Sequence, residues 1–351
     1  MLLQKFNKIQ LQQNVNPAQT VTRLQLLWNE AKRKQLTLYS CSMYGRQLLS
    51  FLLIYKGKNY YFHYSPTTLL HKHFTKFKDP THYDNKYKFK KLLLKNNLPV
   101  PEGRVFFSKN KAFRYGQKLG FPLVVKPVSS TFSHHVTLNI NDEMTLKKAI
   151  NVAKIIDCGV IVERFILGDV HRMMCVGEEF IVCSKRLRAS VVGDGKSTIS
   201  DLIDKLNENS LRGNTERKGA ALYQIKKEEQ LTQYLDAQGL TLNVVLEKEK
   251  KVYLSDKSNC SNGAEVINLT EKVCDENIQL FKKLHMALGI AVSAIDFICE
   301  DVTQPWHSQS FAFLENNSFP AIDPQHYPST GASVDVAKAI WDLVLEYLDT
   351  L

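Results

Sequence analysis

The sequence predicts an α+β protein in which most strands are antiparallel. Short apolar runs alternate with segments of helical spacing along the chain. Turn residues separate two pairs of apolar runs, at Lys56–Asn59 and at Gly177-Glu178, and such spacing predicts hairpins. The hydrophobic content of 44% and the charged content of 23% in 351 residues are ordinary for a folded chain of one to three domains.

The first part of the chain, residues 1–82, predicts a small N-terminal α/β domain. Its helix is expected at 20–35, where apolar residues recur with helical spacing. An apolar strand at 36–42 and a hairpin over 50–65 follow the helix. Turn residues and a loss of apolar pattern near residue 80 mark the predicted end of this domain.

Residues 83–351 predict a second, larger domain. Helical spacing predicts helices at 85–97, 109–120, 141–156, 199–209, 270–289 and 333–348. Apolar runs predict strands at 121–130, 134–140, 159–166, 170–177, 179–187, 290–301 and 310–317. The stretch 211–262 is polar and is expected to be irregular. The strand–strand–helix–strand unit at about 120–185 is expected to form a subdomain of its own.

Composition and charge narrow the function classes. The chain has no apolar run of ~18 residues and a polar start, so we expect no membrane span and no secretion signal. Its seven cysteines lack metal-ligand spacing and are expected to be free thiols in a cytoplasmic protein. The net charge of +11 fits nucleic acid or an anionic small molecule, and its even spread does not decide between them. The densest basic run, residues 86–95, fits a helix with a solvated face as well as a phosphate groove.

An acid and an amide follow the apolar run that begins at Phe311. Residues two apart in a strand share a face, so Glu315 and Asn317 present side-chain oxygens on the same side. Asp296 lies in the preceding apolar strand, where a buried acid needs a partner or a metal. If the two strands pair, the three side chains form an oxygen site suited to magnesium. The alternative is a polar strand end that leads into a turn.

Three further charged residues stand at the ends of predicted elements. Lys126 ends an apolar strand, Lys86 opens a helix, and Glu163 ends another strand. A cation in such a place either reaches solvent or meets a fixed anion, and an acid at a strand end can hydrogen-bond a purine. Taken singly, each is better explained as a surface charge.

The order of these residues, together with one longer motif, resembles the ATP-grasp ligase superfamily. The specific stretch is VVGDGKSTI at 191–199, and LRGN at 211–214 and KNNLPVPEG at 95–103 also fit. Within the superfamily the chain is similar to the ATP-grasp portion of cyanophycin synthetases and of bifunctional glutathione synthetases. The resemblance covers about residues 80–348. It implies an ATP-grasp fold, in which two α+β lobes hold ATP between antiparallel sheets, behind the small N-terminal domain.

The resemblance also implies roles for individual residues. Lys86 and Lys126 match lysines that hold ATP phosphates, and Glu163 with the backbone of Arg164 and Phe165 matches the adenine hinge. The residues that match magnesium ligands are Asp296, Glu315 and Asn317. The basic residues that match positions near the active site are His171, Arg172 and Arg186. The phosphate lid contains Ser133 and His134. Arg186 and Arg172 are the expected catalytic residues, with Arg186 neutralising a phosphoryl group.

The chain departs from the family pattern in the lid. The family lid is rich in glycine, whereas residues 129–136 contain none. Glycine lets a backbone approach phosphates closely, so hydroxyls such as that of Ser133 and the imidazole of His134 are expected to replace its amides. Ala321 stands where the family has glycine, and Val334 where it has arginine.

The resemblance implies an ATP-dependent carboxylate–amine ligase that forms an amide through an acyl phosphate and releases ADP and phosphate. The expected cofactors are ATP and Mg²⁺, with Mn²⁺ as an alternative. The expected partners are small amino-acid or peptide substrates, with no nucleic acid and no membrane, and a homo-oligomer is left open. The alternative is a degenerate nucleotide-binding or regulatory module without turnover, which the glycine-free lid favours.

Overall fold

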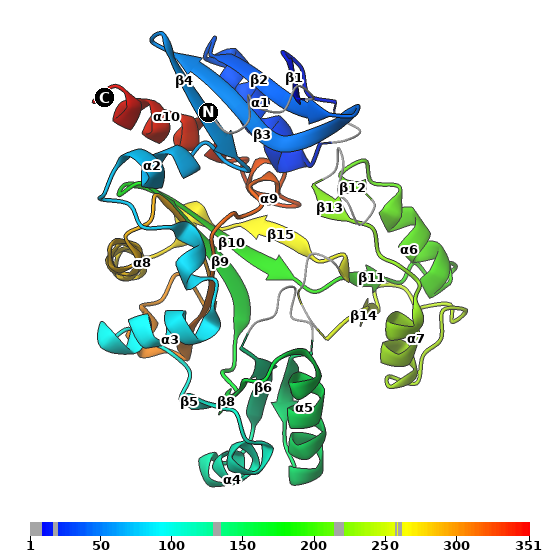
Figure 1. The fold of residues 1–351 in the computed structure, drawn as a ribbon. Coiled ribbons are helices and arrows are strands. Elements are labelled where there is room, and N and C mark those ends of the chain that lie inside the picture. The colour runs from blue at the N-terminus through cyan, green and yellow to red at the C-terminus, as the bar shows by residue number, and fades with distance from the viewer. Residues whose placement is uncertain (1–8, 17–19, 129–134, 214–220, 257, 259–261) are drawn as a thin grey trace. The chain divides into compact units, whose positions relative to one another are not determined.

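The computed structural model describes residues 9–16, 20–128, 135–213, 221–256, 258 and 262–351 (Figure 1). The chain divides into two compact units, each built from separate segments. Unit 1 comprises residues 1–77, 186–268 and 321–351, and unit 2 comprises residues 78–185 and 269–320.

One part of unit 1 is a four-stranded antiparallel sheet that packs against helices from both ends of the chain. The strands run in the order β1 (Ile9–Gln12), β2 (Thr37–Met43), β3 (Arg46–Tyr55) and β4 (Lys58–His63). The helices are α1 (Thr22–Arg33), α2 (Thr68–His73), α9 (Asp323–His326) and α10 (Val336–Leu348). Trp341 of α10 contacts Phe62 of the sheet, and its indole N–H donates to the carbonyl of Leu27 at 2.8 Å. The apolar faces of α1 and α10 therefore close the core of this layer.

The other part of unit 1 has small two-stranded sheets and two helices around a separate apolar core. Its elements are β11 (Ser190–Val192), α6 (Ile199–Asn207), β12 (Arg212–Gly213), β13 (Leu222–Tyr223), α7 (Glu229–Asp236), β14 (Lys251–Tyr253) and β15 (Glu265–Asn268). β11 pairs antiparallel with β14, and β12 pairs parallel with β13. Helix α6 begins at a capping box, in which Thr198 and Asp201 satisfy each other's backbone N–H groups.

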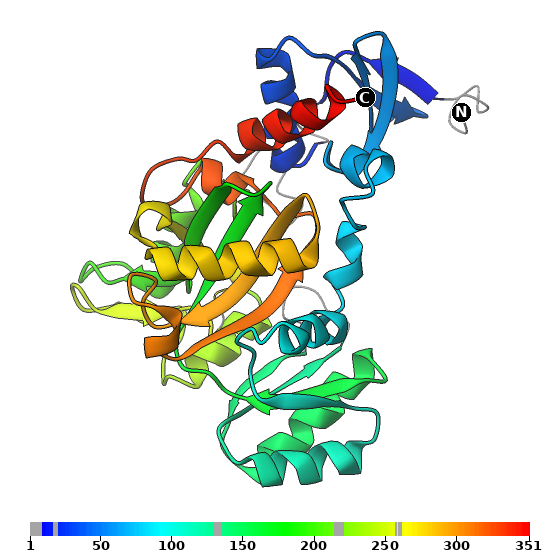
Figure 2. The same cartoon turned by 90° about the vertical axis from the view of Figure 1, so that its left-hand side faces the viewer.

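The larger sheet of unit 2 has the order β10 (Phe180–Leu187), β9 (Asp169–Val176), β16 (Val292–Cys299) and β17 (Phe311–Asn317), all antiparallel. The last two residues of β10 belong to unit 1. Helix α8 (Asp275–Leu288) lies across one face of this sheet (Figure 2). The turns η3 (Pro80–Tyr83), η5 (Thr270–Lys272) and η6 (Trp306–Ser308) and helix α3 (Lys86–Lys95) complete this part.

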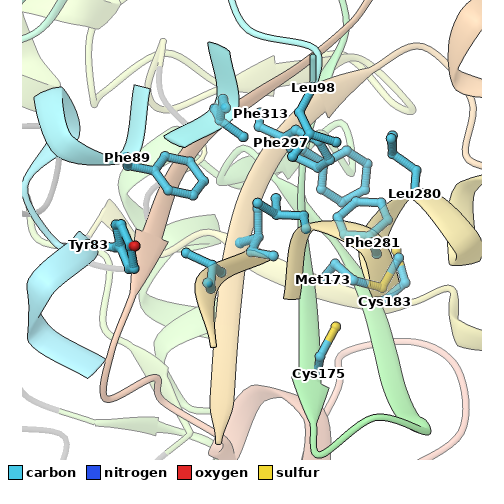
Figure 3. Close-up of a cluster of buried hydrophobic side chains, with 14 of the residues drawn as sticks. Tyr83, Phe89, Leu98, Met173, Cys175, Cys183, Leu280, Phe281, Phe297 and Phe313 are labelled. Atoms are coloured by element: carbon cyan, nitrogen blue, oxygen red, sulfur yellow. The ribbon is translucent and has the colours of Figure 1, made fainter. Parts of the chain in front are cut away.

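The apolar core of unit 2 lies between this sheet and helices α3 and α8 (Figure 3). Phe281 of α8 packs edge-on against Phe297 of β16 and Phe313 of β17. Phe89 and Leu93 of α3 enter the same cluster. This packing fixes α3 along the sheet, which matters below because α3 also carries two buried lysines.

A smaller antiparallel sheet makes up the rest of unit 2. Its order is β5 (Gly103–Phe106), β8 (Val160–Arg164), β6 (Leu123–Pro127) and β7 (Thr137–Ile140). Helices α4 (Lys109–Leu119) and α5 (Glu143–Ile156) cover it and share an apolar core with it. The central strands β6 and β8 carry Lys126 and Glu163.

The structure confirms the α+β class and both predicted hairpins, β3–β4 and β9–β10. Two local expectations were wrong. The stretch 211–262 contains helix α7, whose Leu231 and Leu235 are buried in the apolar core around α6. The helix expected from residue 270 begins at Asp275, because Val273 has an extended backbone. The boundary at 82 and the subdomain at about 120–185 stay predictions.

Two expectations from composition concern membrane spans and cysteines. In the described ranges, no helix is both long and apolar enough to cross a membrane. The described cysteines, which are Cys41, Cys158, Cys175, Cys183, Cys274 and Cys299, are free thiols.

Candidate active site

Two acids meet across neighbouring strands at the edge of the larger sheet of unit 2. Asp296 of β16 lies directly opposite Glu315 of β17, and Ala294 lies opposite Asn317. Residues opposite one another in an antiparallel pair share a face, as do residues two apart in a strand. The structure therefore confirms the strand pairing on which the predicted oxygen site depends, and it brings Asp296, Glu315 and Asn317 to one face.

Each of these two acids is paired with a basic side chain. β9 pairs with β16 on the side away from β17, and its Arg172 lies opposite Asp296. The Arg172 guanidinium donates to both carboxylate oxygens of Asp296, at 2.6 Å and 2.8 Å. Nζ of Lys86, the first residue of α3, lies 3.1 Å from Oε2 of Glu315. Burial makes an unpaired charge costly, so the two cations explain how the sheet accommodates two adjacent acids. We call Asp296, Glu315, Arg172 and Lys86 the Asp296 group.

A second buried charge cluster surrounds Glu163 on the smaller sheet. Nζ of Lys126 lies 2.5 Å from Oε1 of Glu163, and Nζ of Lys90 lies 3.2 Å from Oε2. Glu163 is only 3% exposed. Burial alone would raise the pKa of Glu163, but the charges of Lys126 and Lys90 outweigh burial and hold that pKa below its ordinary value. We call these three residues the Glu163 group.

Lys90 was not singled out from the sequence. It lies on the buried stripe of α3 together with Lys86, Phe89 and Leu93, whereas Lys88 and the other lysines of this helix face solvent. Its ammonium also donates to the carbonyl of Pro101 at 2.5 Å, and burial lowers its pKa. Phe89 and Leu93 stand at helical spacing from Lys86, and that spacing was the signal that could have found Lys90.

The backbone around Glu163 is unusually close-packed. Gly103 of β5 is the register partner of Glu163 on β8. A Cβ added at Gly103 would lie 2.3 Å from the Cβ of Glu163 and 2.5 Å from the carbonyl oxygen of Val162. Glycine at this position therefore lets β5 approach β8 and hold the Glu163 carboxylate between its two lysines.

A hydrogen-bonded link joins the start of α3 to the end of β17. Asp84 accepts from the backbone N–H of Ser318 at 2.9 Å and from its hydroxyl at 2.6 Å. Asp84 precedes Asn85, which caps α3, and Ser318 follows Asn317 directly. The link thus holds the helix turn with Lys86 beside the strand end with Glu315.

Several expected site residues lie elsewhere. His171 is buried on the opposite face of β9 from Arg172, where its ring stacks on Phe297 at 5.2 Å. Burial lowers the pKa of His171 to about 4, so it is neutral in the core at ordinary pH. The structure therefore does not bring His171 together with the Asp296 group.

Two backbone N–H groups of the predicted adenine hinge already donate hydrogen bonds within the protein. The backbone N–H of Arg164 donates to the carbonyl of Glu102, and that of Phe165 donates to the carbonyl of Pro122. The guanidinium of Arg164 pairs with the exposed Glu102 carboxylate at 2.8 Å. The amides of these two residues are thus already used, so a purine would have to meet other atoms of the hinge.

The remaining predicted site residues are Arg186, Ser133 and His134. Arg186 is half-buried near the end of β10 and belongs to unit 1. Ser133 and His134 lie outside the described residues. His135, which follows them, has a φ of 57°, the left-handed region that glycine adopts most readily.

The oxygens of Asp296, Glu315 and Asn317 form a donor set that fits a hard divalent cation. Asp296, Glu315 and Asn317 offer carboxylate and amide oxygens, which Mg²⁺ prefers. The amide nitrogen of Asn317 is directed to the carbonyl of Ala294 at 3.5 Å, which turns its oxygen away from that strand. Within the described part of the chain, no cluster of three or more acids, histidines or cysteines has the arrangement of a metal site. A metal here would therefore rest on two acids and one amide, with other oxygens completing its shell.

Comparison with known proteins identifies relatives. Residues 83–284 match the RimK-like ATP-grasp domain. The chain is 31% identical over 258 residues to cyanophycin synthetase of Crocosphaera subtropica, a match covering 73% of this chain and 29% of that protein. It is 31% identical over 280 residues to the glutathione biosynthesis bifunctional protein GshAB of Enterococcus faecalis, covering 76% and 36%. The chain thus spans about a third of the length of these relatives.

The fold has a counterpart among solved structures. The bifunctional glutathione synthetase of Pasteurella multocida superposes with a TM-score of 0.68 and 24% sequence identity. The superposition covers 93% of this chain and 44% of that protein. The similarity extends beyond residues 83–284 and therefore includes much of the N-terminal and C-terminal segments.

Proposed function

Because the chain belongs to the RimK-like ATP-grasp family, we propose that it is an ATP-dependent ligase that joins a carboxylate to an amine. The predicted ATP-grasp fold is correct. One observation carries the proposal. The paired acids Asp296 and Glu315 and the two elements that bear Lys90 and Lys126, α3 and β6, all lie in unit 2. Asp296 and Glu315 supply oxygens for a metal, and Lys126 and Lys90 supply cations for phosphates.

The proposed reaction has two steps. The substrate carboxylate attacks the γ-phosphorus of ATP, so that a bond to carboxylate oxygen forms and the bond to ADP breaks. The amine then attacks the acyl carbon, phosphate leaves with the bonding electrons, and the amine nitrogen loses a proton. When bound, Mg²⁺ would neutralise charge on the phosphate oxygens. Asp296, Glu315 and Asn317 would hold it, and Mn²⁺ would serve as a substitute.

The basic residues act on charge that spreads over the transferred phosphoryl group. Lys126 and Lys90 carry two positive charges against the single carboxylate of Glu163, which leaves an excess for a phosphate. Arg172 fixes the Asp296 carboxylate through two hydrogen bonds, and a guanidinium keeps its charge at every working pH. We assign Arg186 to the phosphoryl group, and Glu163 to the adenine side, on the family resemblance.

The substrates are proposed to be amino acids or a small peptide. Two relatives are named for cyanophycin synthesis and for glutathione biosynthesis, and glutathione is itself a peptide. A small carboxylate and a small amine therefore fit best, in preference to nucleic acid.

The proposal is tested by phosphate release with ATP and Mg²⁺ over pairs of amino acids. We expect release with at least one pair, and a loss of roughly 10²–10³-fold in Glu315→Gln, because this change removes a charge from the metal site. Glu300→Gln is the matched control, since Glu300 is an exposed acid just beyond β16. Full activity in Glu315→Gln would contradict the metal assignment.

A second candidate is a nucleotide-binding module without turnover. The observation in its favour is the absence of glycine from residues 129–136, where the family lid is glycine-rich. This candidate predicts ATP binding by calorimetry together with no phosphate release for any pair. Any amino-acid pair that gives steady release at a rate sensitive to Glu315→Gln would exclude it.

A further inference from the structure

We propose that the outer face of the paired strands β11 and β14 in unit 1 docks the carboxylates of an acidic peptide, with Arg188 and Lys251 as its cations. Two observations carry this assignment: both cations contact one tyrosine ring, and the strand register places them on one face. The choice of a peptide rests on the proposed function, which this site deepens by naming acidic substrates.

The pair of strands β11 and β14 has a buried face and an outer face (Figure 1). Val191 and Val252 lie opposite one another and are buried in the apolar core around α6. Side chains alternate along a strand, so the neighbours of these valines lie on the outer face. The outer residues are Arg188, Ser190, Val192, Lys251 and Tyr253. They include two cations and no carboxylate.

Both cations of this face contact the ring of Tyr253. The guanidinium carbon of Arg188 lies 3.9 Å from the ring centroid, and Nζ of Lys251 lies 5.2 Å from it. A guanidinium this close to a ring has lost much of its rotational freedom, while its N–H groups remain available as donors. A carboxylate accepts two parallel N–H bonds from such a planar fork. The ring therefore pre-organises Arg188 for a carboxylate.

The positive charges of this face are not compensated by nearby acids. Elsewhere in the same part of unit 1, Lys227 pairs with Asp204 at 2.7 Å. In the part of the chain that the structure describes, neither Arg188 nor Lys251 forms an ion pair. Because both contact one ring, they lie within about 10 Å of each other, about one Debye length at 0.1 M salt, where like charges still repel. An anion bound beside both removes this repulsion, so the face attracts carboxylates.

The surroundings of the two cations favour a peptide over nucleic acid. Proteins that bind single-stranded nucleic acid stack bases on aromatic rings. The half-buried ring of Tyr253 already contacts Arg188 and Lys251, which leaves little of it for a base. A carboxylate needs no ring face. The hydroxyl of Ser190 is a further donor, and Val192, which is 52% exposed, gives apolar surface to the chain between carboxylates.

The test measures binding of a fluorescein-labelled peptide of alternating glutamate and glycine by fluorescence anisotropy, on the full chain without ATP or metal. In Arg188→Gln and in Lys251→Gln we expect binding to become roughly tenfold weaker, because each change removes a cation that faces the carboxylates. The same peptide with glutamine in place of glutamate should bind roughly tenfold more weakly to the wild type. Circular dichroism and the thermal midpoint establish that each variant is folded.

Changes at Tyr253 separate the role of the ring from that of the charges. Tyr253→Phe keeps the ring and should leave the peptide affinity within about twofold of the wild type. Tyr253→Leu removes the ring without changing the charge, so Arg188 is no longer held and binding should weaken roughly fivefold. Lys205→Gln is the matched control, because Lys205 is an exposed lysine of α6 in the same unit. Its removal should change the peptide affinity by less than about twofold.

Three results would overturn the docking site and leave the proposed ligase activity standing. They are no binding of the glutamate peptide to the wild type, an equal loss in Lys205→Gln, and displacement of the peptide by inorganic phosphate at an equal concentration, which would indicate an adventitious ion only. Tighter binding of oligo-deoxythymidine, lost in Arg188→Gln, would replace the peptide by nucleic acid. Phosphate release is measured separately. A chain that binds the peptide through Arg188 but releases no phosphate with any amino-acid pair would contradict the ligase and keep the site.

Discussion

The Glu163 group and the Asp296 group each take a lysine from α3, but their charges balance differently. Glu163 stands between Lys90 and Lys126, so this group carries an excess positive charge. In the Asp296 group, two acids face two cations and the charges cancel. An excess positive charge suits an anion. The comparison teaches that one helix can place lysines one turn apart in two charge clusters of different balance.

The largest expected effect comes from breaking the Glu163 group. Glu163→Leu leaves Lys90 and Lys126 buried without their shared partner, and we expect a loss of about 3–5 kcal/mol in the free energy of unfolding. Urea unfolding at pH 7 measures this loss. Lys88→Ala is the control, since Lys88 is exposed on the same helix and should change stability little.

The same pair of proteins tests the charge state of Glu163. Its folded pKa is depressed, so its contribution is present above the pKa of the unfolded chain and is lost as the pH falls through the folded pKa. The stability difference between wild type and Glu163→Leu should therefore shrink on the acid side of the ordinary glutamate value of 4.5. A difference that stays constant down to acid unfolding would show that Glu163 is not ionised in the fold.

A smaller effect is expected when the support of the Glu163 group is changed and its charges are kept. Gly103→Ala forces a Cβ to within 2.3 Å of the Cβ of Glu163, so β5 and β8 must separate. We expect a loss of about 1–3 kcal/mol in stability, as for other overpacked sites. Urea unfolding of Gly103→Ala beside Arg104→Ala, an exposed neighbour on the same strand, measures it. Equal stability of wild type and Gly103→Ala would mean that the two strands tolerate a wider spacing.

The smallest expected effect has the opposite sign and concerns the strand of the Asp296 group. Asn316 lies between Glu315 and Asn317 but points to the other face, opposite Ile295, and it is 3% exposed. Neither atom of its amide finds a hydrogen-bond partner among the described residues. Asn316→Leu should therefore raise the free energy of unfolding by about 1 kcal/mol, because it removes an unsatisfied buried polar group.

This stabilisation should leave the proposed metal site unchanged, since the two faces of β17 are separate. Thermal unfolding and Mn²⁺ binding in the presence of AMP-PNP, measured on the same variant, check both statements. A destabilised Asn316→Leu would indicate that the amide has a partner that this substitution removes.

The sequence predicted that Asp296, Glu315 and Asn317 share one face, because this part of the geometry is local. Glu315 and Asn317 are two residues apart, and Asp296 lies on the strand just before theirs, so alternation and one hairpin-like pairing bring them together. The pairing of Asp296 with Arg172 could not be predicted in this way. It depends on the register of β16 against β9, which are more than a hundred residues apart in the chain.

Two details of the site could have been refined from the sequence itself. His171 and Arg172 are neighbours in a strand, so alternation already places them on opposite faces and only one can face the site. Lys90 was overlooked because only Lys86 was singled out among the lysines of residues 86–95. Which of them is buried depends on the side of α3 that packs on the sheet, and Phe89 and Leu93 mark that side.

The contact between Trp341 and Leu27 has a consequence for synthesis on the ribosome. Every segment of unit 2 has been made once residue 320 is reached, whereas unit 1 still lacks residues 321–351. The N-terminal sheet and α1 are translated before unit 2, but the side chain that closes their core, fully buried Trp341, comes 314 residues after Leu27. This layer is thus translated before unit 2 and completed after it, and until then part of its apolar face lacks the cover that α10 provides and is prone to aggregation.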